Sequence, residues 1–407
     1  MQFPNWVQAQ SFPAPVSETL PVNESRAAIV PSLRLAERYD SNVFFVPGGK
    51  VDDYVTTVSP QIRTSRKNDW IEGIVGAGAT AEVYAKNPGL NYVGGNGIVK
   101  LNLDGAMNAL VRGLSLHLSD VINYTPQPPA FAAPTGGGQI PEPFVQGVQA
   151  RRANSFTNIA SAEVSYFFSP FMGITSTFVD KRVRFGRPVS RSGQGTQEQE
   201  GFRNTTFQTL TSGPVVKLSE TDEISISHSY SKGSFSDPDR GDSGFHTHGA
   251  RAKWIRSITE EFQVTVEGGF AVMGATGNIY PVGSAELAWE GQYTTAKIAY
   301  SREIVPSFLV LSTPLLSNAV TVTVKRQLAE PLFVTLSGSY AVNESIPDGS
   351  LLRFESYMVG PSLDYKIGKL VTARLSYSHS QFQRGFMGQS FDFDRDGVMF
   401  SLLSEWR

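Results

Sequence analysis

The chain has 407 residues, with 35 Lys and Arg against 37 Asp and Glu and a formal net charge of -2. This balance gives no electrostatic basis for binding nucleic acid, because such proteins concentrate positive charge. The sequence contains no Cys, which excludes disulfide bonds, thiol catalysis and thiolate metal sites.

The N-terminal segment has no clear hydrophobic period and is punctuated by Pro. Residues 1–7 lack a basic stretch followed by an apolar core, so they do not form a signal peptide. Either the protein is not exported or this is a mature chain with an added Met1, and the rest of the sequence favours the mature form. We expect residues 1–26 to be a periplasmic tail or a partner-contact segment, and residues 27–407 to be the folded domain.

From Val30 onward, apolar and polar residues alternate with a period of two, which is typical of strands with one apolar and one polar face. In chain order, the apolar sets include Leu33/Leu35/Tyr39, Val75/Ala77/Ala79/Ala81/Val83, Leu114/Leu116/Leu118, Ala160/Ala162/Val164/Tyr166/Phe168, Ile224/Ile226/Tyr230, Phe262/Val264/Val266, Ala285/Leu287/Trp289, Val320/Val322/Val324, Leu332/Val334/Leu336 and Val371/Ala373/Leu375/Tyr377. No segment of comparable length has a helical period, so the sequence predicts an all-β chain. A hydrophobic share of 40% is low for a chain of this length with a thick, dry core.

Two kinds of connection alternate along the chain. Short turns, such as Ser169-Pro170 and Gly291-Gln292, are separated by longer segments rich in Gly, Pro and Ser. Examples of the longer segments are Pro126–Gln149, Gly186–Gly201, Lys232–Ser243, Glu303–Ser312 and Gln381–Asp392. About 18 strands fit this spacing, and an even number suits a transmembrane antiparallel β-barrel with short periplasmic turns and long extracellular loops. A soluble β-sandwich would not sort its connections in this way.

Aromatic residues cluster near the strand ends, where outer-membrane barrels have their interfacial girdles. They are Tyr39/Phe44/Phe45, Tyr54, Tyr84, Tyr124, Tyr166/Phe167/Phe168, Tyr300, Tyr357/Tyr365 and Tyr377. The last segment resembles the C-terminal signal that the outer-membrane assembly machinery recognises, through Phe400, Leu402 and Trp406, although Arg407 follows the last aromatic residue. We therefore expect the chain in the lipid of a bacterial outer membrane.

The opening strands read Leu33-Arg-Leu-Ala-Glu-Arg-Tyr-Asp-Ser-Asn-Val-Phe-Phe and Val51-Asp-Asp-Tyr-Val-Thr-Thr-Val-Ser-Pro60, and a later stretch reads Arg151-Arg-Ala-Asn-Ser-Phe-Thr-Asn158. These stretches resemble the outer-membrane barrel family associated with exopolysaccharide gene clusters, the EpsL/VpsM-like or "β-barrel porin 2" group. The resemblance implies an outer-membrane exit for a secreted polysaccharide, beside a periplasmic export apparatus.

Parity along the strands predicts which charged side chains face a water-filled lumen. The set is Arg34, Arg38, Arg63, Glu72, Lys100, Glu163, Arg251, Lys253, Glu267, Lys297, Lys325 and Arg374. Basic residues outnumber acidic ones in it, so a mildly anion-favouring lumen is one hypothesis. A mixed wall without preference is the other.

Other candidate sites give weaker signals. His117 shares a face with Ser119, but no Asp partner can be assigned for a hydrolase, so we do not expect an enzyme. His246 and His248 lie two apart on one face and suit a metal ligand pair, but no further ligands are near in sequence. Asp237–Asp242 and Asp392–Asp396 lack the spacing of a calcium loop, and we expect solvated acidic loops. We expect no cofactor, no metal and no nucleic-acid partner.

Pro residues inside three predicted strands, at Pro60, Pro214 and Pro361, predict bulges or kinks near the periplasmic rim, because Pro cannot donate to the strand ladder. The sequence as a whole predicts a channel, with an exopolysaccharide as the expected cargo. The alternatives are a general diffusion porin for small solutes and a barrel sheath around a secretion or redox partner.

Overall fold

A computed structural model describes residues 28–44, 48–125, 152–189, 204–236, 243–306, 314–347, 349, 352–386 and 389–406. Eighteen antiparallel strands form one sheet that closes on itself, because β1 pairs with β18 as well as with β2. The strands are β1 Ala28–Asp40, β2 Asp53–Lys67, β3 Glu72–Tyr84, β4 Tyr92–Asn102, β5 Leu114–Thr125, β6 Arg152–Phe167, β7 Met172–Val189, β8 Asn204–Lys217, β9 Asp222–Ser236, β10 Ser243–Ser257, β11 Phe262–Met273, β12 Ile279–Glu290, β13 Thr294–Pro306, β14 Pro314–Ala329, β15 Leu332–Ser345, β16 Leu352–Ile367, β17 Val371–Phe386 and β18 Gln389–Glu405. The predicted barrel and its strand number are confirmed.

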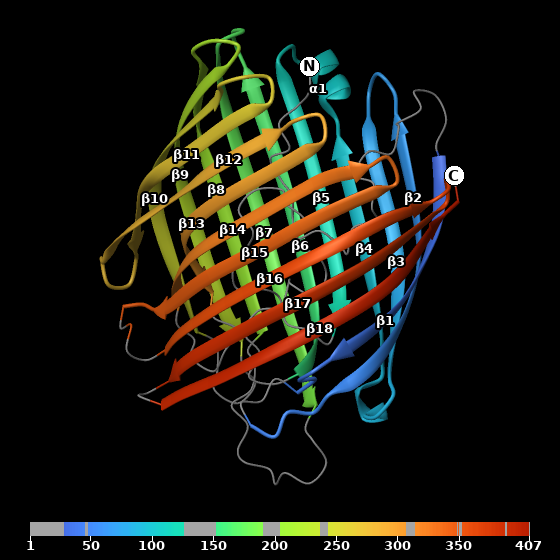
Figure 1. The fold of residues 1–407 in the computed structure, drawn as a ribbon. Helices are drawn as coiled ribbons and strands as arrows, with labels where there is room; N and C mark the ends of the chain where they lie inside the picture. Colours follow the sequence, from blue (N-terminus) through green and yellow to red (C-terminus); the bar gives the residue numbers. More distant parts are fainter. Residues whose placement is uncertain are drawn as a thin grey trace.

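The closed order follows the chain order, so every strand pairs with its two sequence neighbours (Figure 1). Closure leaves no strand edge unpaired, which a sheet in lipid requires because the hydrocarbon offers no hydrogen-bond partners. The predicted N-terminal tail, residues 1–26, lies outside the described residues.

The connections at one end of the barrel are short, and Figure 1 shows them at the upper end. A single residue pair, Glu330 and Pro331, joins β14 to β15, and three or four residues join most other pairs at this end. This end is called the short-turn end below, and the opposite end is called the loop end.

One connection at the short-turn end contains a helix that the alternation pattern did not predict. α1 spans Asp104–Leu110 between β4 and β5, and the amide of Ala106 donates to the carbonyl of Trp70 in the β2–β3 turn. A Cβ on Gly105 would lie 1.8 Å from the carbonyl oxygen of Asp69, so this docking requires glycine. Seven residues are too short for a helical period to stand out in the sequence. None of the helices in the described residues is long and apolar enough to cross a membrane.

Several predicted loops are partly strand. β9 continues to Ser236, β13 to Pro306 and β17 to Phe386, so only residues 387–388 separate β17 from β18. The prediction of a long loop over Gln381–Asp392 is therefore wrong. The backbones of β17 and β18 remain hydrogen-bonded in this region, although the side chains no longer alternate between apolar and polar. Backbone pairing does not require that alternation.

The predicted bulges at the three prolines are also wrong. In β2, β8 and β16 the pairing with the next strand lapses for two residues at Ser59–Pro60, Gly213–Pro214 and Gly360–Pro361, and then resumes in the same register. The pairing with the preceding strand is continuous through each Pro. Each Pro thus removes a donor on one side without adding a residue to the strand.

Candidate channel lumen

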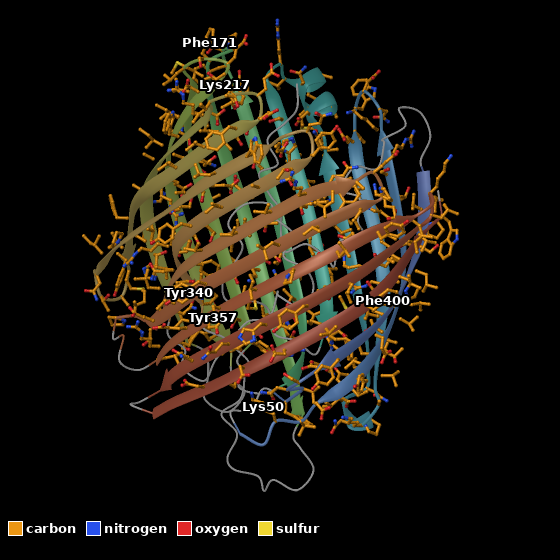
Figure 2. All side chains as sticks on the ribbon, viewed as in Figure 1. Lys50, Phe171, Lys217, Tyr340, Tyr357 and Phe400 are labelled. Carbon is orange, nitrogen blue, oxygen red and sulfur yellow. The ribbon has the colours of Figure 1, made fainter. Side chains whose placement is uncertain are left out.

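The outer surface of the barrel carries an apolar band. Exposed apolar side chains alternate with inward-facing polar ones, as in Leu35 against Arg34 and Leu375 against Arg374. The three residues of the predicted assembly signal, Phe400, Leu402 and Trp406, lie on this outer face, with 37–49% of each side chain exposed. Figure 2 shows Phe400 on the outside of the wall.

Two different aromatic girdles border the band. At the short-turn end, the indole Nε1 of Trp254 donates to Asp222 over 3.2 Å, and that of Trp289 donates to Glu261 over 3.2 Å. At the loop end, exposed tyrosines donate their hydroxyl groups to polar residues farther along the wall. These bonds are Tyr300 to Asn318 at 3.3 Å, Tyr340 to Glu355 at 3.1 Å, Tyr357 to Gln381 at 2.6 Å and Tyr377 to Asp396 at 2.7 Å.

The two girdles mark the borders of the lipid, since Trp and Tyr place an apolar ring in lipid and a polar tip in water. Figure 2 shows Phe171 and Lys217 at the short-turn end, with Tyr340 and Tyr357 toward the loop end. Not every predicted girdle residue lies at these borders: Phe44 packs against a buried cluster that includes Val55 and Tyr84, and Phe45 is outside the described residues. Tyr84 is only 2% exposed and faces inward, where its hydroxyl donates to Glu82.

All twelve charged residues predicted for the lumen occupy inward-facing positions of the alternation. Most of them contact a partner of opposite charge. The sequence could not show which residues pair, because the partners lie on other strands. The partners themselves also occupy inward-facing positions of their strands.

The largest group of these ion-paired residues is a network centred on Arg251 of β10. Its guanidinium donates to Glu267 of β11 at 2.8 Å and to both carboxylate oxygens of Glu303 of β13 at 2.7 Å. The bond to Glu303 spans β11 and β12 on the inner face, and the residue opposite Arg251 on β11 is Gly269, which leaves the path clear. A bidentate pair fixes the guanidinium in one orientation. These side chains are 20–29% exposed, so they contact the lumen.

Two ion pairs near the loop end are buried. Arg38 of β1 lies 3.5 Å from Glu82 of β3, and the side chains are 10% and 8% exposed. Arg395 of β18 donates to both oxygens of Asp40 of β1, with side chains 9% and 2% exposed. Arg38 therefore contributes to the wall and presents little charge to the lumen.

The remaining predicted residues have varied surroundings. Arg374 donates to Asp364, Lys297 lies 2.8 Å from Glu286 and Glu72 lies 3.4 Å from Lys67. Lys325 stacks over the ring of Phe333 at 5.5 Å, Arg34 donates to the sulfur of Met399 at 3.2 Å, and Lys253 lies opposite Glu267 in the β10–β11 register. Arg63 and Lys100 face inward on β2 and β4.

The partner of His117 was missed in the sequence because it lies in the unpredicted helix. His117 Nε2 lies 3.1 Å from Asp104 of α1, and Nδ1 lies 3.8 Å from Glu163 of β6. Ser119 on the same strand has a buried hydroxyl oxygen with no hydrogen-bond partner. The imidazole therefore bridges two carboxylates and does not contact the hydroxyl that a hydrolase would activate.

His246 and His248 face outward on β10, and their rings lie 6.0 Å apart. Within the described ranges, no group of three or more His, Asp or Glu residues is arranged to hold a metal ion. Asp237–Asp242 lies outside the described residues. Asp392–Asp396, expected as an acidic loop, is part of β18, where Asp394 pairs with Lys50 at 2.6 Å and Asp396 with His379 at 2.8 Å.

An apolar cluster lies inside the barrel near the loop end, and its members come from opposite walls. Val183 and Phe185 of β7 belong to the same cluster as residues on β14, β16, β17 and β18. These are Leu315, Leu352, Phe354, Phe382 and Phe393, and Phe382 stacks on Phe393 at 4.9 Å. Six strands separate β7 from β14 in one direction and β7 from β18 in the other. The cluster thus crosses the lumen and narrows it.

No known family profile and no curated protein sequence matches this chain. Among solved structures, the chain is similar to the outer membrane protein OpdK of Pseudomonas aeruginosa, with 11% identity, 93% of this chain and 99% of that chain covered, and a TM-score of 0.45. It is also similar to OccAB3 of Acinetobacter baumannii, with 12% identity, coverage of 93% and 99%, and a TM-score of 0.43. A third, the siderophore receptor PirA of Pseudomonas aeruginosa, has 8% identity, coverage of 93% and 80%, and a TM-score of 0.44.

The closed barrel itself, with an even number of strands, an apolar outer band and two aromatic girdles, has the architecture of bacterial outer-membrane proteins. The protein is an integral protein of that membrane, with the short turns on the periplasmic side and the loop end outside.

Proposed function

We propose that the protein is a porin-like channel whose cargo is a secreted polysaccharide. The channel assignment rests on the inner wall. There, ion-paired side chains that are 17–37% exposed alternate with small hydroxyl-bearing residues. Such a wall is too polar for a packed core but suits water.

The chemistry of this wall supports a sugar as the cargo. Opposite charges are paired in the middle of the barrel, as in Arg251 with Glu303 and Lys297 with Glu286, so the wall presents little uncompensated charge. Hydroxyl groups line the same face, including Ser59 bonded to Thr80 and Thr209 bonded to Ser231. Paired charges and hydroxyl groups offer many weak hydrogen bonds, and conduction needs binding that is weak and repeated.

The apolar cluster narrows the path that a sugar chain would take. Its rings Phe354, Phe382 and Phe393 are only 1–6% exposed, so they form part of the wall and offer no free ring face to the cargo. The same cluster opposes the sheath alternative, because a barrel that surrounds a protein partner would need an open bore.

Planar-bilayer recording of the detergent-refolded protein tests the proposal. Neutral and anionic oligosaccharides of matched length are added on one side, and we expect steady channels whose current is blocked more strongly as the sugar lengthens. Channels that pass ions and show no block by any sugar would identify a general diffusion porin and remove the polysaccharide assignment. Folded, inserted protein without any current would remove the channel itself.

A further inference from the structure

A group of exposed basic side chains lies on the outer face of the barrel, beyond the apolar band at the loop end. It consists of Arg182 and Arg184 of β7, Lys232 of β9, and His246 and His248 of β10, and is called the outer basic patch below. These strands are neighbours in the closed sheet, together with β8 (Figure 1). Each of the five residues has the parity of the lipid-facing side chains of its own strand, so none of them contributes to the lumen.

Strand register brings these residues together. Arg182 lies opposite Thr206 of β8, Lys232 lies opposite His246, and His248 lies opposite Tyr230. The ring centroids of Tyr230 and His248 are 4.9 Å apart.

The patch borders a cavity of about 600 Å³ at the rim of the wall. Its lining includes the outward-facing Arg184, Thr206, Tyr230, Lys232 and His246. It also includes the inward-facing Val183, Thr205, Phe235 and Phe245, so the cavity reaches both faces of the wall at the rim. Two cations, two hydroxyl groups and an imidazole border its outer side. These are donors that a phosphate group accepts from several sides.

The patch has almost no negative charge of its own. Asp180 of β7 is the one acid on the loop-end half of the outer face in the described parts of β7 to β10. It is 6% exposed and is already bonded to Arg182 at 2.6 Å and to Gln208 at 3.0 Å. Within the described residues, neither Arg184 nor Lys232 forms an ion pair, so their charges are uncompensated.

The opposite sector of the same rim is different. There the outer face carries Glu344 and Glu355 around Arg353, with Arg353 lying 3.0 Å and 2.8 Å from them. In this sector two carboxylates compensate the positive charge of Arg353.

The height of the patch identifies the kind of ligand that reaches it. Ile226 of β9 and Leu210 of β8 are 59% and 45% exposed on the lipid-facing surface, and Tyr230, 37% exposed, lies farther toward the loop end on the same face of β9. Lys232 comes next on the same face of β9. The lysine and arginine side chains thus begin where acyl chains end, which is the level of lipid headgroups.

We propose that the outer basic patch binds the phosphate groups of a lipid headgroup in the leaflet that surrounds the loop end. Arg184 and Lys232 supply the charge-assisted hydrogen bonds, while Thr206 and His246 complete the cradle. The lipid chains of the same molecule lie along Leu210 and Ile226. This site is on the outside of the barrel and does not depend on what passes through the lumen.

Native mass spectrometry of the full-length protein in detergent tests the proposal, with two probes that differ only in phosphate: diphosphorylated lipid A and its dephosphorylated form. We expect the phosphorylated lipid to bind at least about tenfold more tightly. Equal binding of the two lipids by the unaltered protein would overturn the proposal, and this comparison needs no variant.

The double variant Arg184→Gln/Lys232→Gln should lose that preference, whereas Arg353→Gln, at the same rim but flanked by acids, should retain it. Arg184→Lys/Lys232→Arg should also retain it, because the charges remain. Folding of each variant is checked by its heat-dependent migration on a gel.

Binding that survives the double Gln variant would overturn the assignment to this patch. Displacement of the lipid by an equal concentration of inorganic phosphate would mean that the patch is a simple anion site. That result would overturn the assignment of a lipid as the ligand.

Discussion

At the scale of single residues, the wall of the barrel is held by ion pairs that differ greatly in burial. Arg395 and Asp40 are almost completely buried, whereas Lys50 and Asp394 are 39% and 41% exposed. Burial removes the solvation of both charges, so each buried member depends on its partner. Exposed pairs keep their water and are worth little.

Replacing Asp40 with Ala should lower the free energy of unfolding by about 3–5 kcal/mol, because Arg395 would remain buried without its anion. Asp394→Ala is the matched control, since it removes one member of an exposed pair between the same two regions and should have a far smaller effect. Urea unfolding in detergent micelles, followed by tryptophan fluorescence, measures both. Equal losses for the two variants would contradict this account.

At the scale of elements, two features depend on how segments meet: the turn between β4 and β5 and the cluster shared by β7, β14, β16, β17 and β18. Gly113 ends the α1 connection with φ +86°, and a Cβ there would lie 2.2 Å from the carbonyl oxygen of Phe167. The amide of Phe167 also donates to the carbonyl of Gly113 at 2.8 Å. This close approach joins the turn to β6.

Gly113→Ala should destabilise the barrel by more than the roughly 1–2 kcal/mol expected for a left-handed backbone conformation alone. Gly277→Ala is the control: it has φ +71° with nothing within 4 Å of its Cβ position, so it should show the conformational cost without the clash. The same unfolding measurement compares them. A Gly113→Ala variant as stable as Gly277→Ala would mean that the turn can shift away from β6.

Phe382→Ala should enlarge the single-channel conductance, because the stacked pair with Phe393 is part of the cluster that narrows the lumen. It should also reduce stability by about 3–5 kcal/mol, as for other buried Phe residues. Phe400→Ala, on the lipid-facing side of the neighbouring strand, should leave the conductance unchanged. Bilayer recording measures the single-channel conductance of both variants. An unchanged conductance in Phe382→Ala would mean that the narrowest point of the lumen lies elsewhere.

At the scale of the whole molecule, the paired charges favour the neutral wall over the anion-favouring one. Both alternatives were open from the sequence, because parity showed mainly the basic members. The structure adds Glu82, Glu286, Glu303 and Asp364 as their partners. A balanced wall predicts anion and cation permeabilities that are nearly equal.

Glu303→Gln should shift the selectivity of the channel toward anions, because it removes one negative charge from the wall while Arg251 keeps Glu267 as its partner. A change of one unit charge about 10 Å from a passing ion contributes about 0.4 kcal/mol in a water-like dielectric, which is about a twofold change in permeability. The reversal potential in a salt gradient measures this, with Glu355→Gln on the outer face as a control that should not shift it. A reversal potential that is unchanged in Glu303→Gln would mean that ions do not pass near Arg251.

The sequence predicted the barrel, the strand number and the inward parity of the twelve charged residues assigned to the lumen, because consecutive side chains of a strand point to opposite faces. It failed where local pattern and tertiary contact diverge. α1 was missed because seven residues are too few to show a helical period, and the strand over Gln381–Phe386 was missed because backbone pairing outlasts the apolar alternation. At the prolines, the local loss of a donor was predicted, but the neighbouring strands kept the register.

The sequence by itself determined which side of every strand meets lipid and which side meets the lumen, because alternation fixes the direction of each side chain relative to its neighbours. Only the tertiary structure decided which inward residues meet. Glu303 reaches Arg251 across two strands, and Val183 belongs to the same apolar cluster as Phe354 of the opposite wall. Such contacts depend on strand register and on closure of the sheet, and both are properties of the assembled barrel that no single strand encodes.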